Sequence, residues 1–141
     1  MRRLRPAAAD DEGTILPLVI GYVVVALAAV FVCVCATDLY LAQKRLDGLA
    51  DAAALAAADG FTLAVEAGEP RAELTSAGVR EQAGALLAAA PGDVALIAAE
   101  ASDGVSARVT VASVWHPPLV SMFVPDGVAI DATATSRTAL R

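Results

Sequence analysis

The chain has 141 residues, enough for one small domain, and 57% of them are hydrophobic although only 4% are aromatic. Alanine and valine supply most of this apolar content, which favours closely packed helices over a large aromatic core. The formal net charge of −6 argues against a nucleic-acid partner. Residues 1–13 sum to zero and residues 14–37 carry no charge, so the whole net charge lies in residues 38–141.

The uncharged apolar run from Thr14 to Thr37 predicts a transmembrane helix. About 20 helical residues cross a bilayer core of about 30 Å, so the run is long enough to span it with some tilt. With Thr14 as the N-cap, Pro17 falls in the first turn, where no intrahelical N–H is lost. We therefore expect the helix to begin near Thr14, after an N-terminal segment at residues 1–13.

The flanking basic residues predict the orientation of this helix. Three arginines and the amino terminus precede the run, whereas Lys44 and Arg45 follow it. Basic residues favour the cytoplasmic side, so we expect a cytoplasmic N-terminus and an extracytoplasmic C-terminal part in the cell membrane. A cleaved signal peptide stays an alternative, because Val34 and Ala36 could occupy the −3 and −1 positions of a cleavage site. A buried core helix is disfavoured, because so small a protein cannot wrap the run.

Residues 38–60 predict an extramembrane continuation of the same helix. They are rich in helix formers, so a continuous helix is expected from Ile15 to Asp59, with Asp59-Gly60 as its stop. Apolar residues alternate at spacings of three and four, like a coiled-coil seam that packs either on the protein's own domain or on a neighbouring subunit. The residues of this predicted seam are Leu39, Ala42, Leu46, Leu49, Ala53 and Ala56.

A second helix is predicted after residues 61–70, with Pro70 at one of its early positions and Pro91-Gly92 as its end. Its expected apolar face consists of Leu74, Ala77, Ala83, Leu86, Leu87 and Ala90.

From Val94 the apolar period becomes strand-like. Two strands joined at Ser102-Asp103-Gly104, and a third at residues 128–138, predict a three-stranded antiparallel sheet with helix on one face. The fold class expected is therefore α+β, with a long N-terminal helix, a second helix and this sheet in a small extracytoplasmic domain at residues 61–141.

The connection between the second and third strands, residues 116–127, is apolar, although loops are usually polar. It is either tucked under the sheet or exposed as a contact surface. The apolar residues of this predicted contact loop are Leu119, Val120, Met122 and Phe123.

The residues also suggest a family. GTILPLVIGYVVV at the start of the span, followed by DLYLAQKRLDGLADAAALAAADG, resembles the N-terminal half of TadE/TadG-like proteins. Those proteins are membrane-anchored components of the tight-adherence (Flp, type IVc) pilus assembly system. The pattern shared with the family is a glycine after charged residues, an apolar span, an acidic residue with an aromatic residue soon after it, a basic pair and an alanine-rich stretch. The closing strand GVAIDATATSRT is similar too, so the resemblance runs over residues 12–139.

The resemblance implies a pilin-like or pseudopilin-like, single-pass membrane protein that acts in pilus assembly or secretion. The implied partners are the membrane, other assembly or secretion subunits in a homo- or hetero-oligomer, and a prepilin peptidase. Some members are cut after a glycine, and the corresponding bond in this chain is the one between Gly13 and Thr14. Those members carry a glutamate five residues into the mature chain. Leu18 stands in that place, so the span has no carboxylate to neutralise a neighbouring amine.

Nothing in the sequence predicts an enzyme or a cofactor. His116, the one histidine, sits in a proline-rich loop, and no Ser/His/Asp arrangement, metal-ligand cluster or phosphate loop is apparent. The leading hypothesis is therefore a TadE/TadG-like pilus-assembly subunit or accessory protein. The alternatives are an exported binding domain released near Ala36 and an anchored accessory factor of another secretion system.

Overall fold

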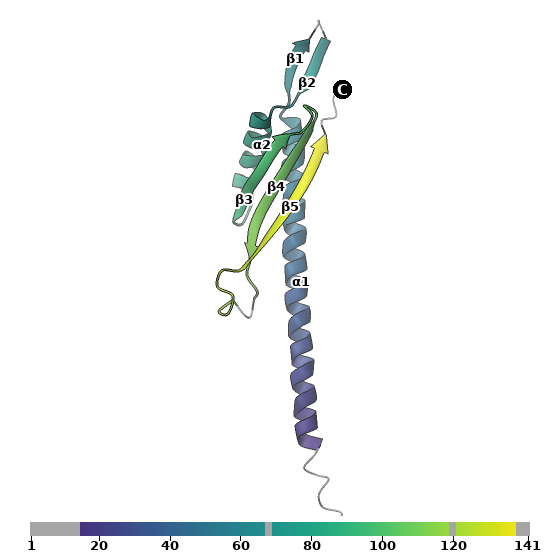
Figure 1. Cartoon of the computed structure of the whole chain (residues 1–141), viewed down its shortest axis with the longest axis vertical. Coiled ribbons are helices and arrows are strands. Elements are labelled where there is room, and N and C mark those ends of the chain that lie inside the picture. Colours follow the sequence, from purple (N-terminus) through teal and green to yellow (C-terminus); the bar gives the residue numbers. More distant parts are fainter. Residues whose placement is uncertain (1–14, 67–68, 119–120, 138–141) are drawn as a thin grey trace, which may run out of the picture. The chain divides into compact units, whose positions relative to one another are not determined.

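The computed structural model describes residues 15–66, 69–118 and 121–137. It divides into two compact units, Met1–Thr37 and Asp38–Arg141. Helix α1 (Ile15–Asp59) supplies the described part of the first unit and continues into the second (Figure 1). The predicted α+β class, with a long apolar N-terminal helix, a second helix and a three-stranded antiparallel sheet, is confirmed.

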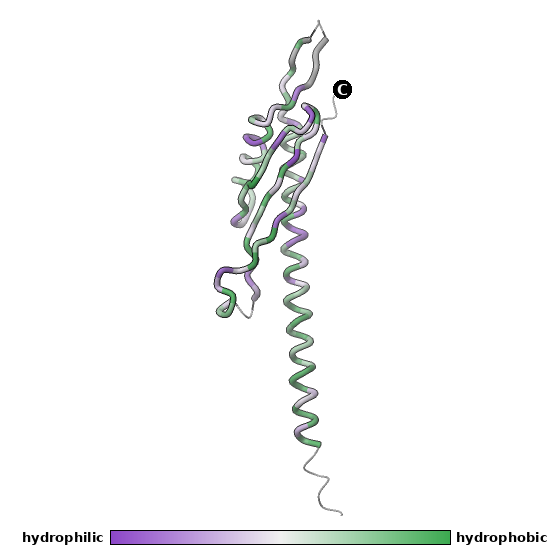
Figure 2. Tube along the Cα trace, in the orientation of Figure 1, coloured by the Kyte–Doolittle hydropathy of each residue, from purple (hydrophilic) through white to green (hydrophobic). Residues whose placement is uncertain are grey.

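In the first unit, α1 presents its apolar side chains outward. Its most apolar stretch is long and apolar enough to cross a membrane, and none of that stretch is buried. Figure 2 shows that hydropathy along α1 changes from mainly apolar to mixed toward Asp59. The one side-chain hydrogen bond among the described residues of this unit is local, from Thr37 Oγ1 to the Cys33 carbonyl at 2.8 Å. The predicted bounds of the helix, Ile15 and Asp59, agree with the structure.

The second unit contains the end of α1, a β-ribbon, a helix and a sheet. The three-stranded sheet has the order β3-β4-β5 and is antiparallel throughout, with β4 in the centre. The elements after α1 are β1 (Thr62–Glu66), β2 (Glu69–Glu73), α2 (Ser76–Ala89), β3 (Val94–Ala101), β4 (Ser106–Trp115) and β5 (Val128–Arg137).

The core of this unit lies between the helices and one face of the sheet. Alternation along β4 turns Ala107, Val109 and Val111 inward, and each is fully buried. The opposite face stays open, where the hydroxyls of Thr110 and Thr133 form an exposed cross-strand hydrogen bond of 2.9 Å. Because alanine lacks a long side chain, the helices can approach the sheet closely. The helical core residues are Leu46, Ala50, Ala53, Ala54, Ala57 and Ala58 of α1, with Val79, Ala83 and Leu87 of α2.

The start of the second helix was predicted too early. Pro70 lies in β2, paired with Val65 in the two-stranded β1–β2 ribbon, and not in a helix. Both strands of such a ribbon are edges, so a residue without a backbone N–H is tolerated there. Helix α2 is instead capped by Thr75, whose hydroxyl accepts a hydrogen bond from the Gly78 N–H at 3.2 Å.

The predicted face of α2 differs from the structure at four residues. Val79 is fully buried and was missed, although its spacing to Ala83 and Leu87 is helical. Leu74 is buried but precedes the helix, Ala77 is exposed, and Ala90 is the C-cap that follows the last helical residue. The later start at Ser76 explains why Leu74 lies outside the helix, and the helical period through Val79, Ala83 and Leu87 places Ala77 on the other side.

The turn between β3 and β4 is organised by Asp103. Its carboxylate accepts hydrogen bonds from the backbone N–H groups of Val105 at 3.1 Å and Ser106 at 2.6 Å, and from the Ser106 hydroxyl at 3.0 Å. Gly104 follows with a φ of 72°, a conformation that glycine adopts without strain. The N–H of Val105, with smaller help from Ser106 and Arg137, holds the pKa of the Asp103 carboxyl below its ordinary value.

This shift predicts an acid-sensitive contribution to stability. Because the folded pKa lies below the ordinary value of 3.8, the stabilisation is complete above that value and is lost as the pH falls through the folded pKa. Asp103→Asn should therefore lower the urea midpoint at about pH 7, and its difference from the parent should shrink toward about pH 2.5. A difference that stays constant over this range, measured by circular dichroism, would contradict the assignment.

Candidate functional site

The part of α1 that follows the apolar run is fixed to the sheet by a tryptophan. Trp115 is the last residue of β4, and its indole N–H donates a hydrogen bond to Asp38 Oδ2 at 2.7 Å. Asp38 is the first charged residue after the uncharged run. A partly buried indole normally finds a partner for its N–H, and a carboxylate makes this bond charge-assisted. The Trp115 end of the sheet is thus held beside Asp38.

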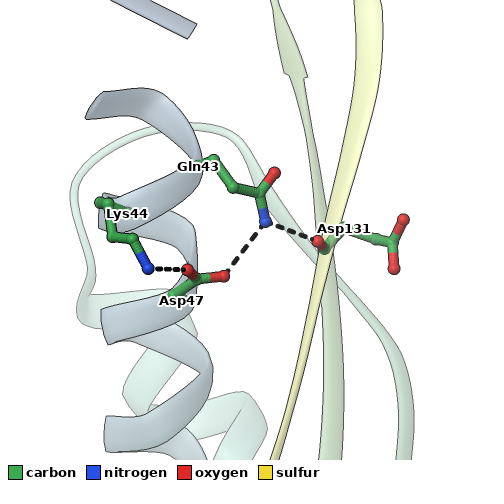
Figure 3. A network of polar contacts seen from close by, with 4 residues as sticks. All are labelled: Gln43, Lys44, Asp47 and Asp131. Atoms are coloured by element: carbon green, nitrogen blue, oxygen red, sulfur yellow. Dashed lines mark hydrogen bonds and ion pairs between the residues drawn. The ribbon is translucent and has the colours of Figure 1, made fainter. Parts of the chain in front are cut away.

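One turn further along α1, a polar network joins the helix to β5 (Figure 3). Gln43 Nε2 donates to the Asp131 carbonyl oxygen at 2.9 Å and to Asp47 Oδ1 at 3.1 Å. Lys44 Nζ binds Asp47 Oδ2 at 3.1 Å and lies 5.9 Å from the centre of the Tyr40 ring. These contacts fix the rotation of α1 against the sheet.

Lys44 and Asp47 of this network each favour their charged form. The hydrogen bond from Lys44, followed by the one from Gln43, holds the pKa of Asp47 below its ordinary value. The same bond to Asp47 raises the pKa of Lys44. Both groups therefore stay ionised near neutrality, and solvent screens an exposed pair of this kind strongly. The network therefore orients the helix against the sheet.

A hollow of about 270 Å³ lies beside this network, between α1, the loop after α2 and the Trp115 end of the sheet. Arg45, Asp93 and His116 contribute its ionisable lining. Over residues 15–66, 69–118 and 121–137, no group of three His, Cys, Asp or Glu side chains is placed to hold a metal ion. The arrangement is one of packing and orientation.

The segment that contains α1 matches a known family model. Residues 13–60, about a third of the chain, match the family model described as "Putative Flp pilus-assembly TadE/G-like". The chain carries a TadE/G-like segment. The match includes all of α1 and agrees, over residues 13–60, with the resemblance predicted from the sequence, whereas the resemblance noted beyond Gly60 stays a prediction. No curated protein and no solved structure matches the chain.

Within the TadE/G-like segment, the predicted seam lies toward the protein's own sheet. Leu46 and Ala53 are buried, and the other four seam residues are half-buried. Packing on the protein's own domain, one of the two alternatives, is therefore present, and a role of the seam in lateral contacts stays a prediction. The most exposed side of α1 beyond Thr37 carries Leu41, Gly48, Ala52 and Leu55.

The other predicted site residues lie in two places. Met122 and Phe123 are 80% and 78% exposed, so the interpretation of a tucked loop is wrong for these two side chains. Their neighbours Leu119 and Val120 lie outside the described residues, as do Gly13 and Thr14 of the predicted processing site.

The contacts that tie the TadE/G-like segment to the sheet were not predicted from the sequence. Asp38 was only the first residue of a stretch noted for its resemblance to a family, and no partner was predicted for Trp115. A signal was available for the tryptophan, because a lone indole at the end of an inward-facing strand pattern needs an acceptor. No sequence signal pointed to Gln43, since its partner is the Asp131 backbone carbonyl.

The hydrogen bond of Trp115 gives a prediction for stability. Trp115→Phe removes the indole N–H and keeps an aromatic ring, so it should reduce the free energy of unfolding by about 0.5–1.5 kcal/mol. Asp38→Ala should produce a similar loss, and the double variant should lose less than the sum. Far-UV circular dichroism during urea unfolding measures all three, and strictly additive losses would show that the two side chains do not interact.

Proposed function

We propose that the protein is a single-pass membrane subunit or accessory protein of Flp (tight-adherence) pilus assembly, with a structural and not an enzymatic role. The observation that carries this proposal is the coincidence of two features in α1. The TadE/G-like match covers residues 13–60, and the same helix contains a stretch long and apolar enough to cross a membrane.

The proposed topology has four parts. Residues 1–13 lie in the cytoplasm, residues 14–37 span the membrane, and residues 38–60 carry the helix beyond it. Residues 61–141 complete a small extracytoplasmic α+β domain. The arginines before the span support this orientation through the preference of basic residues for the cytoplasmic side.

Lateral contact with neighbouring subunits is proposed to use the outer side of α1. Leu41 and Leu55 are 47% and 58% exposed, and Gly48 lies between them at heptad spacing, with open space where a Cβ would stand. A leucine–glycine–leucine pattern of this kind allows a second helix to approach closely. The neighbour is another copy of the chain or another assembly subunit.

Two processing alternatives remain as proposals. Cleavage between Gly13 and Thr14 by a prepilin peptidase would leave a span with Leu18 where pilin-like relatives have a glutamate, so subunits would meet without charge pairing. Cleavage after Ala36 would release an exported domain. That bond lies inside α1, two residues from the Asp38 carboxylate that binds Trp115, so the helix would have to unwind before it could be cut.

Cysteine crosslinking in native membranes tests the proposal. Leu55→Cys, in a chain with Cys33→Ala and Cys35→Ala, should form adducts with another pilus-assembly component or a second copy, identified by mass spectrometry. Arg108→Cys, on the exposed outer face of the sheet, is the matched control and should give few adducts. Recovery of monomer alone from both variants would contradict an assembly role through this helix.

A further inference from the structure

The connection from β4 to β5 presents two apolar side chains to the surroundings. Met122 and Phe123, at 80% and 78% exposed, are the two most exposed large hydrophobic residues among the described side chains. The connection is closed by a hydrogen bond from the Gly127 N–H to the Val124 carbonyl at 3.2 Å. A Cβ on Gly127 would lie 2.8 Å from the Trp115 carbonyl oxygen, so the chain passes close to the strand end there. Met122 and Phe123 therefore belong to a connection whose C-terminal end is held against the end of the sheet.

The base of this connection lies beside Asp38. Trp115 pairs with Val128 at the end of the sheet, and the indole of Trp115 is hydrogen-bonded to Asp38. Figure 1 shows the connection at the end of the sheet opposite the β1–β2 ribbon. Asp38 directly follows Thr37, the last residue of the uncharged run. If that run spans a bilayer, chain continuity brings the lipid surface to the end of the sheet that carries Met122 and Phe123.

The surrounding side chains are those of a membrane interface. Tyr40 is 61% exposed, Trp115 is half-buried, and Lys44 lies near the Tyr40 ring. Aromatic residues with an apolar body and a polar end, and lysines with long apolar stems, are typical of the boundary between lipid and water. Residues 116–127 contain one acidic residue, Asp126, and no lysine or arginine. Contact with lipid would therefore rely on apolar insertion and not on attraction to anionic headgroups.

We propose that Met122 and Phe123 insert into the bilayer surface at which α1 emerges, as a second membrane contact of the folded domain. The proposal rests on the proposed transmembrane role of residues 14–37. One helix leaves the folded domain free to tilt against the bilayer surface, whereas a second, off-axis contact limits that tilt.

Site-directed spin labelling of the full chain in bilayer nanodiscs tests this contact. Single cysteines replace Phe123, Val30 and Val65, one at a time, in a chain with Cys33→Ala and Cys35→Ala. Val30 is 61% exposed in the apolar run and reports the anchor, whereas Val65 is 74% exposed on the β1–β2 ribbon and reports water. Each label is measured for relaxation by oxygen, which partitions into lipid, and by a nickel chelate, which stays in water.

The label at position 123 is expected to resemble the one at position 30, with strong relaxation by oxygen and several-fold weaker relaxation by the chelate than at position 65. If position 123 behaves like position 65 while position 30 is in lipid, the second contact is refuted and the anchor stands. If position 30 is itself exposed to the chelate, the proposed span fails and this inference fails with it. A spin label on Met122→Cys should keep its protection from the nickel chelate when Phe123→Tyr is added. The same label should lose part of that protection when Phe123→Asp is added.

Discussion

Two arginines in the apolar run, Val24→Arg with Leu27→Arg, are expected to remove the protein from the membrane. Both side chains lie near the middle of residues 14–37 and are exposed, at 60% and 64%. An arginine near the centre of a membrane helix costs about 2.5–3.5 kcal/mol on insertion scales, so the pair costs about 5–7 kcal/mol. The described part of the run has no acidic residue that could pair with the new charges. Fractionation with an alkaline carbonate wash measures the result.

The matched control places the same two arginines outside the run. Leu63 and Val65 on β1 are 66% and 74% exposed, so Leu63→Arg with Val65→Arg adds the same charge at a similar exposure. This variant should stay in the membrane pellet. Retention of the Val24 and Leu27 variant after the wash would contradict the assignment of the run as a membrane span.

The second large effect is expected at Leu46, where α1 meets the sheet. Leu46 is 2% exposed and belongs to the core, so Leu46→Ala should leave a cavity and reduce the free energy of unfolding by about 2–5 kcal/mol. In a small domain this is a large share of the total stability. Urea unfolding of the full chain in mild detergent, followed by circular dichroism, measures the loss.

Leu55→Ala is the control for this substitution, because it deletes the same atoms from the same helix. Leu55 is 58% exposed, so its change should stay within about 0.5 kcal/mol in a monomer. Equal losses from the two variants would mean that residues 38–59 do not pack on the sheet in the way the structure indicates.

The strongest periodic patterns were predictable from the sequence. Helix α1 follows from an uncharged run, an alanine-rich continuation and a glycine stop, and these are local signals. The strands follow from the alternation around Val109 and Val111, together with the Asp103-Gly104 turn. In each case the residues that decide the element lie within the element itself.

The remaining features depend on residues that are distant in the sequence. Pro70 reads locally as a helix start, but the pairing of β1 with β2 places it in a ribbon edge. The bond between Asp38 and Trp115 joins residues 77 positions apart, and no periodicity encodes it. The exposure of Met122 and Phe123 is likewise a tertiary property, because composition alone fits both a tucked and an exposed loop.

The intact mass of the protein, measured in both the membrane fraction and the soluble fraction of its own cells, tests the central claim most directly. A protein anchored by the proposed span must retain residues 14–37, so the mass should correspond either to the full chain of 14.2 kDa or to a chain that begins at Thr14. Either mass is compatible with anchoring, and the difference between them decides whether the bond after Gly13 is cut. A soluble product that begins at Thr37 would contradict the account, because the domain would then have left its anchor.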